Sequence, residues 1–158
     1  MVALYIVDTN SFYTLGHYYP SRFPTIWRKV DDLVREGKLR SVKEVRREIE
    51  SNCPFDHITE WVRTNRKIFK APSIEEMTVV SDILSKKQYR RLVKRSNILR
   101  GLPVADPFII AAAKVYHGCV VTQEIYKPDG ARIPNACDEL RIQCINVEQF
   151  LEYEGLVY

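Results

Sequence analysis

The chain has 158 residues, a length that suits one domain with a core of its own. Hydrophobic residues make up 46% of the chain and charged residues 28%, which excludes an intrinsically disordered protein. No apolar run approaches the length that a membrane span needs. The formal net charge of +4 is too small to identify a partner by itself, so the distribution of charge carries more information than its sum.

The N-terminus and the cysteines both favour a cytoplasmic protein. Residues 1–5 contain no basic region, and Asp8 interrupts the apolar stretch, so the segment does not have the pattern of a signal peptide. The four cysteines, Cys53, Cys119, Cys137 and Cys144, contain no C-x-x-C pair. We therefore expect reduced, buried thiols, and neither disulfides nor a zinc site.

The first half of the chain is predicted to begin with a strand and to continue with helices. Its expected elements are a buried strand at 2–7, a short helix near 11–15, a helix at 24–36, an extended segment at 39–40 and helices at 42–51 and 56–65. Ser41 and Glu44 have the spacing of a capping box, which predicts Ser41 as the N-cap of the helix at 42–51. Gly37 and Pro54 mark the ends of the helices before them.

The second half is predicted to return to alternating strands and helices. A capping box at Ser73 and Glu76 opens helical sequence that can run, with one break, to about residue 99. Asp106 is the expected N-cap of a helix at 107–117. A strand at 119–122, a loop at 123–134, a strand at 142–145 and a final helix from Asn146 to Gly155 complete the chain.

This order predicts an α/β fold in one domain, residues 1–158. Strands near both ends of the chain alternate with helices, which is typical of a three-layer sandwich around a small central parallel sheet. The middle of the chain, about 53–100, reads as a helical insert.

Acidic side chains stand at the ends of three core elements. Asp8 ends the first apolar strand, Asp106 opens an apolar helix, and Glu124 follows the strand at 119–122. A carboxylate at such a position is costly to bury and adds nothing to packing. Because sites in parallel sheets form at the carboxyl ends of the strands, these acids are expected to share one pocket, where a divalent cation would offset their charge.

At this point the chain resembles the PIN-domain ribonucleases. The residues that carry the resemblance form four short motifs in the family's order: Val7-Asp8-Thr9-Asn10, Ser41-x-x-x-Val45-x-x-Glu48-Ile49, Ala105-Asp106-x-x-Ile109-x-Ala111-Ala112 and Val121-Thr122-x-Glu124. The resemblance covers nearly the whole chain, although residues 53–100 do not match a minimal PIN domain. The family most often has Asp where this chain has Glu124.

The resemblance implies a function and a set of site residues. It implies a metal-dependent endoribonuclease in which Asp8, Glu48, Asp106 and Glu124 are catalytic and hold one or two Mg²⁺ or Mn²⁺ ions, with Asn10 and Thr122 in support. Glu48 would either bind metal or deprotonate the attacking water. The short members of the family further imply a toxin, an antitoxin partner and a homodimer.

Each acid also has an ordinary structural interpretation. Asp106 can serve only as an N-cap, Glu48 can be ion-paired on a highly charged helix, and Glu124 can be a plain loop acid. Asp8 can merely cap the short helix that follows it. The four interpretations together require four unrelated coincidences in the family's order, and this makes the shared site the better hypothesis.

A run of basic residues suggests a surface for a polyanion. Residues 28–100 contain 19 Lys and Arg against 11 Asp and Glu, whereas the rest of the chain has more acids than bases. Within this segment six residues recur at i, i+4 spacing and would form one positive stripe on a helix: Lys86, Lys87, Arg90, Arg91, Lys94 and Arg95. The stripe is expected to contact RNA phosphates, or alternatively an acidic protein, or only solvent.

Two other functions remain open. Asp8 after a strand can be the nucleophile of a phosphatase, but the second Asp which that chemistry needs two residues later is Asn10 here. A PIN-like chain can also bind RNA or protein without cleaving anything. Retention of all four acids argues against this second alternative.

Overall fold

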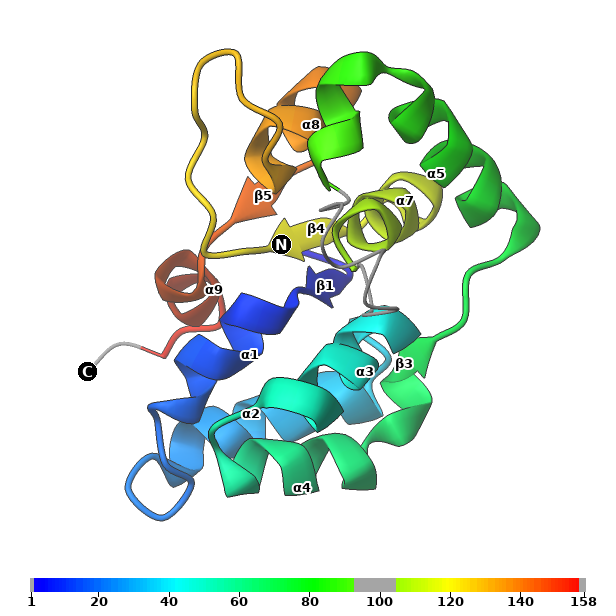
Figure 1. The fold of residues 1–158 in the computed structure, drawn as a ribbon. Coiled ribbons are helices and arrows are strands. Elements are labelled where there is room, and N and C mark those ends of the chain that lie inside the picture. Colours follow the sequence, from blue (N-terminus) through cyan, green and yellow to red (C-terminus); the bar gives the residue numbers. More distant parts are fainter. Residues whose placement is uncertain (1, 93–104, 157–158) are drawn as a thin grey trace.

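The computed structural model describes residues 2–92 and 105–156, which surround one central sheet (Figure 1). All strand pairs in the sheet are parallel, and the strand order is β3-β2-β1-β4-β5. The strands are short: β1 Tyr5–Val7, β2 Leu39–Val42, β3 Phe69–Lys70, β4 Cys119–Val121 and β5 Cys144–Ile145. The predicted α/β fold around a small parallel sheet is therefore confirmed.

Helices cover both faces of this sheet (Figure 1). Their bounds are α1 Thr9–Gly16, α2 Pro24–Arg35, α3 Lys43–Asn52, α4 Asp56–Thr64, α5 Ile74–Ser85, α7 Asp106–Tyr116, α8 Ile133–Leu140 and α9 Val147–Tyr153, with 3-10 turns η1 Arg66–Ile68 and η2 Lys87–Leu92. Among the described residues, none of these helices has both the length and the apolar character that crossing a membrane requires.

The alternation of side chains along β1 explains how the layers form. Tyr5 packs edge-on against Phe150 of α9, with 4.8 Å between ring centroids, so it faces that helix. Ile6 points the opposite way, towards Gly118 at the end of α7, where a Cβ atom would lie 3.0 Å from the Ile6 side chain. Both residues are fully buried, and β1 is therefore the centre of a two-sided core.

Most of the expected elements are present, but the middle of the chain differs from the prediction. The insert is not purely helical, because Phe69 and Lys70 form the edge strand β3. The predicted helix from Ser73 ends at Ser85, Lys86 is extended, and the 3-10 turn η2 follows; residues 93–99 of that prediction lie outside the described residues. Ser73 does cap α5, since its hydroxyl accepts from the Glu76 amide.

The capping box predicted at Ser41 is wrong. Ser41 lies in β2, where it is fully buried, and its hydroxyl donates to the Val7 carbonyl at 2.6 Å. Val42 is the N-cap of α3. The helix α8 was not predicted either, because its first residues, Ile133 and Pro134, follow the turn-rich segment without a clear N-cap signal.

The four cysteines are free thiols, and two of them are buried as predicted. Cys119 and Cys137 are buried, while Cys53 and Cys144 are partly exposed. Burial raises the pKa of Cys119 to about 12, so this thiol stays protonated and unreactive at neutral pH.

We predict that Gly16→Ala destabilises the protein by about 1–3 kcal/mol, as overpacking in a core typically does. A Cβ atom on Gly16 would lie 2.6 Å from the Phe55 ring, which packs against the end of α1. Thermal unfolding followed by circular dichroism measures the effect. Phe55→Leu in the same background should recover part of the loss, and an unchanged unfolding midpoint in Gly16→Ala would contradict this close contact.

Candidate active site at the carboxyl ends of the strands

Asp8 is the best-defined acid of the predicted set. It follows β1 directly, is 2% exposed, and caps α1 by accepting the Ser11 amide proton at Oδ1 over 2.8 Å. Its other oxygen, Oδ2, accepts from the Thr122 hydroxyl at 2.6 Å. Thr122 follows β4, the parallel neighbour of β1, so the sheet itself brings these two residues together. Both carboxylate oxygens are thus fixed in direction.

Glu48 reaches the same end of the sheet from α3. Its Oε2 accepts from the Thr9 hydroxyl, and its carboxylate also accepts from the Ala105 backbone amide. Burial is the main cause that raises its pKa, and the negative charge of Asp8 raises it further. Glu48 therefore lies between the start of α1 and the start of α7, within electrostatic reach of Asp8.

Asp106 is the first residue of α7, next to Ala105. It was predicted as the N-cap, but Ala105 holds that position and makes no side-chain cap. Pro107, expected at the first helical position, therefore lies at the second. Asp106 is partly exposed, and its carboxylate stands at the positive end of the α7 dipole.

Glu124 approaches from the loop after β4. Its amide donates to the Thr122 hydroxyl at 3.1 Å, and its Oε2 accepts from the Ile133 amide at the start of α8 over 2.8 Å. Its charge is near enough to raise the pKa of Asp8. Glu124 thus has a structural role as a helix cap and still belongs to the electrostatic group around Asp8.

The two supporting residues differ in their placement. Thr122 is buried and joins two of the acids, because its hydroxyl donates to Asp8 and accepts from the Glu124 amide. Asn10 is exposed on α1. The geometry therefore connects Thr122 with the acids directly, while the role of Asn10 stays a prediction.

The described surroundings of Asp8 and Glu48 oppose the ionisation of both carboxyls. Burial is the largest cause that raises the pKa of Asp8 and of Glu48, and each of them is raised further by a neighbouring carboxylate. Within the described residues, no ion pair with Lys, Arg or His involves Asp8, Glu48 or Glu124. Hard carboxylate oxygens in such an environment suit a divalent cation such as Mg²⁺ or Mn²⁺.

The arrangement is nevertheless not a closed metal cage. In the part of the chain that the structure describes, no three His, Cys, Asp or Glu side chains are placed so that they could hold one ion. One oxygen of Glu124 is bound to the Ile133 amide, and one of Glu48 to the Thr9 hydroxyl. The donor types and the charge fit a divalent ion, while a shared ion would require these carboxylates to turn.

Three residues that the sequence did not single out position the acids. Thr9 and the Ala105 amide hold Glu48. Ser11 holds Asp8 through its amide, and its hydroxyl donates to the Val121 carbonyl at 2.9 Å. A hydroxyl residue directly after an acid at a strand end is a usable signal for Thr9. Ser11 and Ala105 hold the acids through backbone amides, which the sequence does not mark.

The described part of the predicted basic stripe, up to residue 92, is not a single α-helix. Lys86 is extended and its Nζ lies 2.5 Å from an oxygen of Glu139, while the Arg90 guanidinium donates to the Leu84 carbonyl at 3.3 Å. Lys87 is exposed at the start of the 3-10 turn η2. Lys94, Arg95 and the side chain of Arg91 lie outside the described residues.

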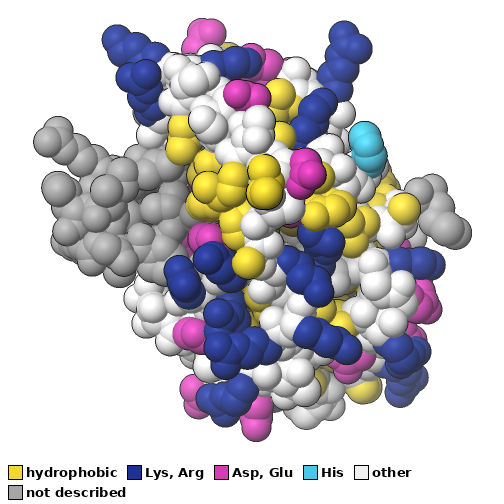
Figure 2. Space-filling model, turned by 90° about the vertical axis from the view of Figure 1, so that its right-hand side faces the viewer, with side chains coloured by type: hydrophobic (Ala, Val, Ile, Leu, Met, Phe, Trp, Pro, Cys, Tyr) yellow, Lys and Arg dark blue, Asp and Glu magenta, His cyan; other side chains and the backbone are white. Residues whose placement is uncertain are grey.

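Positive charge also gathers away from the stripe. Figure 2 looks onto the side of the molecule that carries β3 and α5, and Lys and Arg crowd its lower half, below a group of hydrophobic side chains. The exposed basic residues of α4, η1 and β3 are Arg63, Arg66, Lys67 and Lys70. A polyanion would therefore meet positive potential over more than one surface.

Comparisons with known proteins give a family and two solved structures. The model of a family described as "Domain of unknown function (DUF4411)" matches residues 5–158. No curated protein matches the chain. PAE2754 from Pyrobaculum aerophilum is 17% identical, with a TM-score of 0.48 over 99% of this chain and 100% of its own. VapBC2 from Rickettsia felis, bound to a DNA fragment from their promoter, is 14% identical, with a TM-score of 0.49 over 90% and 98%.

Proposed function

Because the chain belongs to the DUF4411 family, a domain of unknown function, we propose its activity from the site itself: a metal-dependent endoribonuclease that hydrolyses RNA phosphodiester bonds. One observation supports this most. Asp8 is buried, fixed by two hydrogen bonds and surrounded by the charge of other acids, an arrangement that costs stability and is typical of a functional site.

Asp8, Asp106 and Glu124 are the residues that would hold Mg²⁺ or Mn²⁺, as one or two ions, with Glu48 beside them. When bound, the metal supplies charge stabilisation at the phosphate and lowers the pKa of a bound water. The chain itself contributes orientation, because the Ser11 amide and the Thr122 hydroxyl keep the Asp8 carboxylate from rotating.

Glu48 is the residue we assign to proton transfer. Burial raises the pKa of its carboxyl, which brings it closer to neutral pH and makes it a better base than an exposed glutamate. It would take a proton from the attacking water as the water oxygen bonds to phosphorus and the bond from phosphorus to the leaving oxygen breaks. The Thr9 hydroxyl and the Ala105 amide hold it in place for that step.

Cleavage of RNA by the full chain in Mg²⁺ or Mn²⁺ tests the proposal. Asp106→Asn should lower the cleavage rate by at least about a hundredfold while the fold, measured by circular dichroism, is retained. Asp56→Asn is the matched control, because Asp56 is likewise the first residue of a helix but lies on α4. Equal rates in the native protein and in Asp106→Asn would refute the assignment.

The cellular role that we propose is that of a toxin held inactive by an antitoxin protein. This part rests on the resemblance of the motifs to short PIN-domain toxins, which also suggests a homodimer. Induced expression in bacteria should arrest growth, and Asp106→Asn should abolish the arrest. Unimpaired growth on expression of a protein that cleaves RNA in vitro would separate the toxin role from the nuclease activity.

A second candidate is a binding module that holds RNA or protein without cleavage. It is favoured by the hydrogen bond between Glu124 and the Ile133 amide and by the absence, among the described residues, of three ligands placed for one ion. RNA binding that survives Asp106→Asn, together with no cleavage by the native protein in either metal, would establish this alternative.

A further inference from the structure

A cavity of about 420 Å³ opens directly beside the candidate active site. Thr122 and Glu124 line the cavity and also form the edge of the acidic site, so the two adjoin. The rest of the lining comes from the loop after β4, from α8, from β5 and the segment before it, and from the start of α9. A molecule whose phosphate lay at the acids would place its neighbouring part here.

Two large apolar side chains of this loop face solvent without a packing role. Ile125 is 73% exposed and Tyr126 is 52% exposed, and both line the cavity. Exposed apolar groups that adjoin polar lining are typical of a binding site. Tyr126 offers a flat aromatic face at the rim, which suits stacking on another planar ring.

The loop that presents these side chains is held firmly in shape. Asn135 donates to the Lys127 carbonyl at 2.6 Å and accepts from the Arg132 amide at 3.3 Å, so it joins the two limbs. The Gln88 side chain donates to the Gly130 carbonyl, and a Cβ atom at Gly130 would lie 2.8 Å from the Lys127 carbonyl oxygen. The exposure of Tyr126 is thus a feature of an ordered loop.

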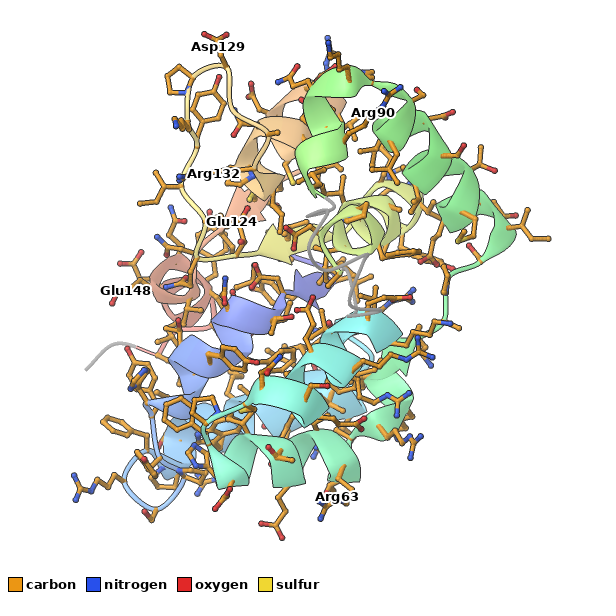
Figure 3. All side chains as sticks on the ribbon, viewed as in Figure 1. Arg63, Arg90, Glu124, Asp129, Arg132 and Glu148 are labelled. Atoms are coloured by element: carbon orange, nitrogen blue, oxygen red, sulfur yellow. The ribbon has the colours of Figure 1, made fainter. Side chains whose placement is uncertain are left out.

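Figure 3 shows how the loop rises from the edge of the site at Glu124. Glu124 lies near its base, Asp129 at its tip, and Arg132 on the returning limb. The Arg132 guanidinium donates to the Ile125 carbonyl at 3.2 Å, which fixes the backbone next to Tyr126. Arg132 remains exposed, so a positive charge stands near the path of a bound polyanion.

The cavity also offers hydrogen-bond donors. Asn146 and Gln149 form a reciprocal cap at the start of α9, in which each side-chain oxygen accepts from the other residue's amide. This arrangement uses both oxygens and leaves the two NH₂ groups to act as donors towards the cavity that these residues line. Asp138 adds an acceptor. Donors, an acceptor and an aromatic face together match the edge and the face of a nucleobase.

We propose that this cavity binds one unpaired nucleobase of the RNA, stacked on Tyr126, next to the phosphodiester bond at the acidic site. The inference rests on the proposed nuclease function and adds the place where a base of the substrate binds. A base in a duplex is paired and stacked and cannot enter, so the substrate is single-stranded RNA or a loop. Stacking tolerates any base, and therefore the cavity selects strandedness more than sequence.

The test uses Tyr126→Leu and Tyr126→Phe in the full chain, with Tyr153→Leu as the control. Tyr153 is also 52% exposed but lies at the end of α9, beside a different cavity. Tyr126→Leu should raise KM for a single-stranded RNA of about ten nucleotides by about tenfold, whereas Tyr126→Phe and Tyr153→Leu should behave as the native protein does. kcat should change by less than about threefold, since no reacting group is removed.

A second measurement reports stacking without any cleavage. RNA that carries 2-aminopurine, added to Asp106→Asn protein, should lose fluorescence on binding, and Tyr126→Leu in that background should abolish the loss. A duplex of the same sequence should bind at least about tenfold more weakly. If Tyr126→Leu cleaves RNA with the native KM, and quenching persists when Tyr126→Leu is added to Asp106→Asn, the base-binding cavity is refuted. The nuclease proposal is unaffected by that result.

The remaining outcomes separate this inference from the nuclease proposal. Quenching that depends on Tyr126 in a protein that never cleaves would support the cavity and refute the nuclease. If RNA does not bind but a co-purifying protein partner is lost in Tyr126→Leu, the cavity is a protein-docking surface and the inference is wrong.

Discussion

Asp8→Asn is expected to abolish RNA cleavage and, in the absence of metal, to make the protein more stable at neutral pH. The rate should fall by at least about a thousandfold, because the best-fixed carboxylate of the site is lost. The unfolding midpoint should rise by a few degrees. The opposite signs of the two effects make this substitution more informative than one that only inactivates.

The gain in stability follows from the surroundings of Asp8. Its carboxyl is 2% exposed and burial raises its pKa, so the ionised form destabilises the folded state at neutral pH. Asparagine has nearly the same shape, and its Oδ1 can still accept the Ser11 amide proton. Its Nδ2 can donate to the Thr122 hydroxyl, which now accepts where it donated before. The charge disappears and both contacts of this side chain are kept, but the buried Thr122 hydroxyl proton loses its acceptor, which offsets part of the gain.

Thermal unfolding with a chelator, and then with Mg²⁺ or Mn²⁺, measures the predicted change. The native protein should be stabilised by the cation, because ligands that bind only the folded state raise its stability, and Asp8→Asn should lose most of that response. Asp56→Asn, an exposed control, should respond as the native protein does. A less stable Asp8→Asn protein, or one that still cleaves RNA, would remove Asp8 from the site.

The position of the central acids could be foreseen because parallel strands share an end. β1 and β4 are neighbours, and Asp8 and Thr122 follow them directly, so the pairing that forms the sheet also makes their contact. Glu124 was less predictable. Its hydrogen bond to the Ile133 amide depends on how the loop between them closes, and no local sequence pattern determines that closure.

The errors in the predicted elements have a common cause: tertiary contacts outweighed local signals. Ser41 and Glu44 have capping spacing, but Ser41 gains more from pairing in β2 and from its bond to the Val7 carbonyl. The edge strand Phe69–Lys70 has only two residues, too few for any periodicity to show. It exists because β2 offers it hydrogen-bonding partners.

The basic residues are a second case in which tertiary contacts outweigh a local sequence pattern. The i, i+4 spacing after Asp82 predicts that the basic residues share one helical face, yet α5 ends at Ser85 and Lys86 turns away to pair with Glu139. The exposed Tyr126 loop, by contrast, reads as an ordinary polar turn in the sequence. Its order comes from Asn135, which belongs to the unpredicted helix α8, and from Gln88, which is distant in the chain.

Glu44→Gln and Glu48→Gln form a matched pair that should agree in stability and differ in activity. Both residues lie on α3, one turn apart, and burial raises the pKa of both carboxyls. We expect each variant to be more stable than the native metal-free protein at neutral pH. Glu48→Gln should lower cleavage by about 10²–10⁴-fold, the typical contribution of a general base, while Glu44→Gln leaves cleavage unchanged.

The pH dependence determines whether the two substitutions raise or lower the stability of the protein. A carboxyl whose folded pKa is raised stabilises the protein fully below the pKa of the unfolded chain, about 4.5, and this contribution is lost as pH rises through the higher folded pKa. Both variants should therefore match the native protein at about pH 4 and exceed it at neutral pH. The gain should be larger for Glu44→Gln, whose Oε2 has no hydrogen-bond partner within the described residues, than for Glu48→Gln, which disturbs the bonds from Thr9 and Ala105.

Cleavage then separates a buried carboxylate that only costs stability from one that performs chemistry. Unfolding midpoints from acidic to neutral pH, in chelator, and cleavage rates at neutral pH provide the two measurements. If Glu44→Gln also loses cleavage while gaining stability, the active site extends one turn further along α3 than we propose. If Glu48→Gln cleaves at the native rate, proton transfer belongs to another group, and the raised pKa of Glu48 reflects burial alone.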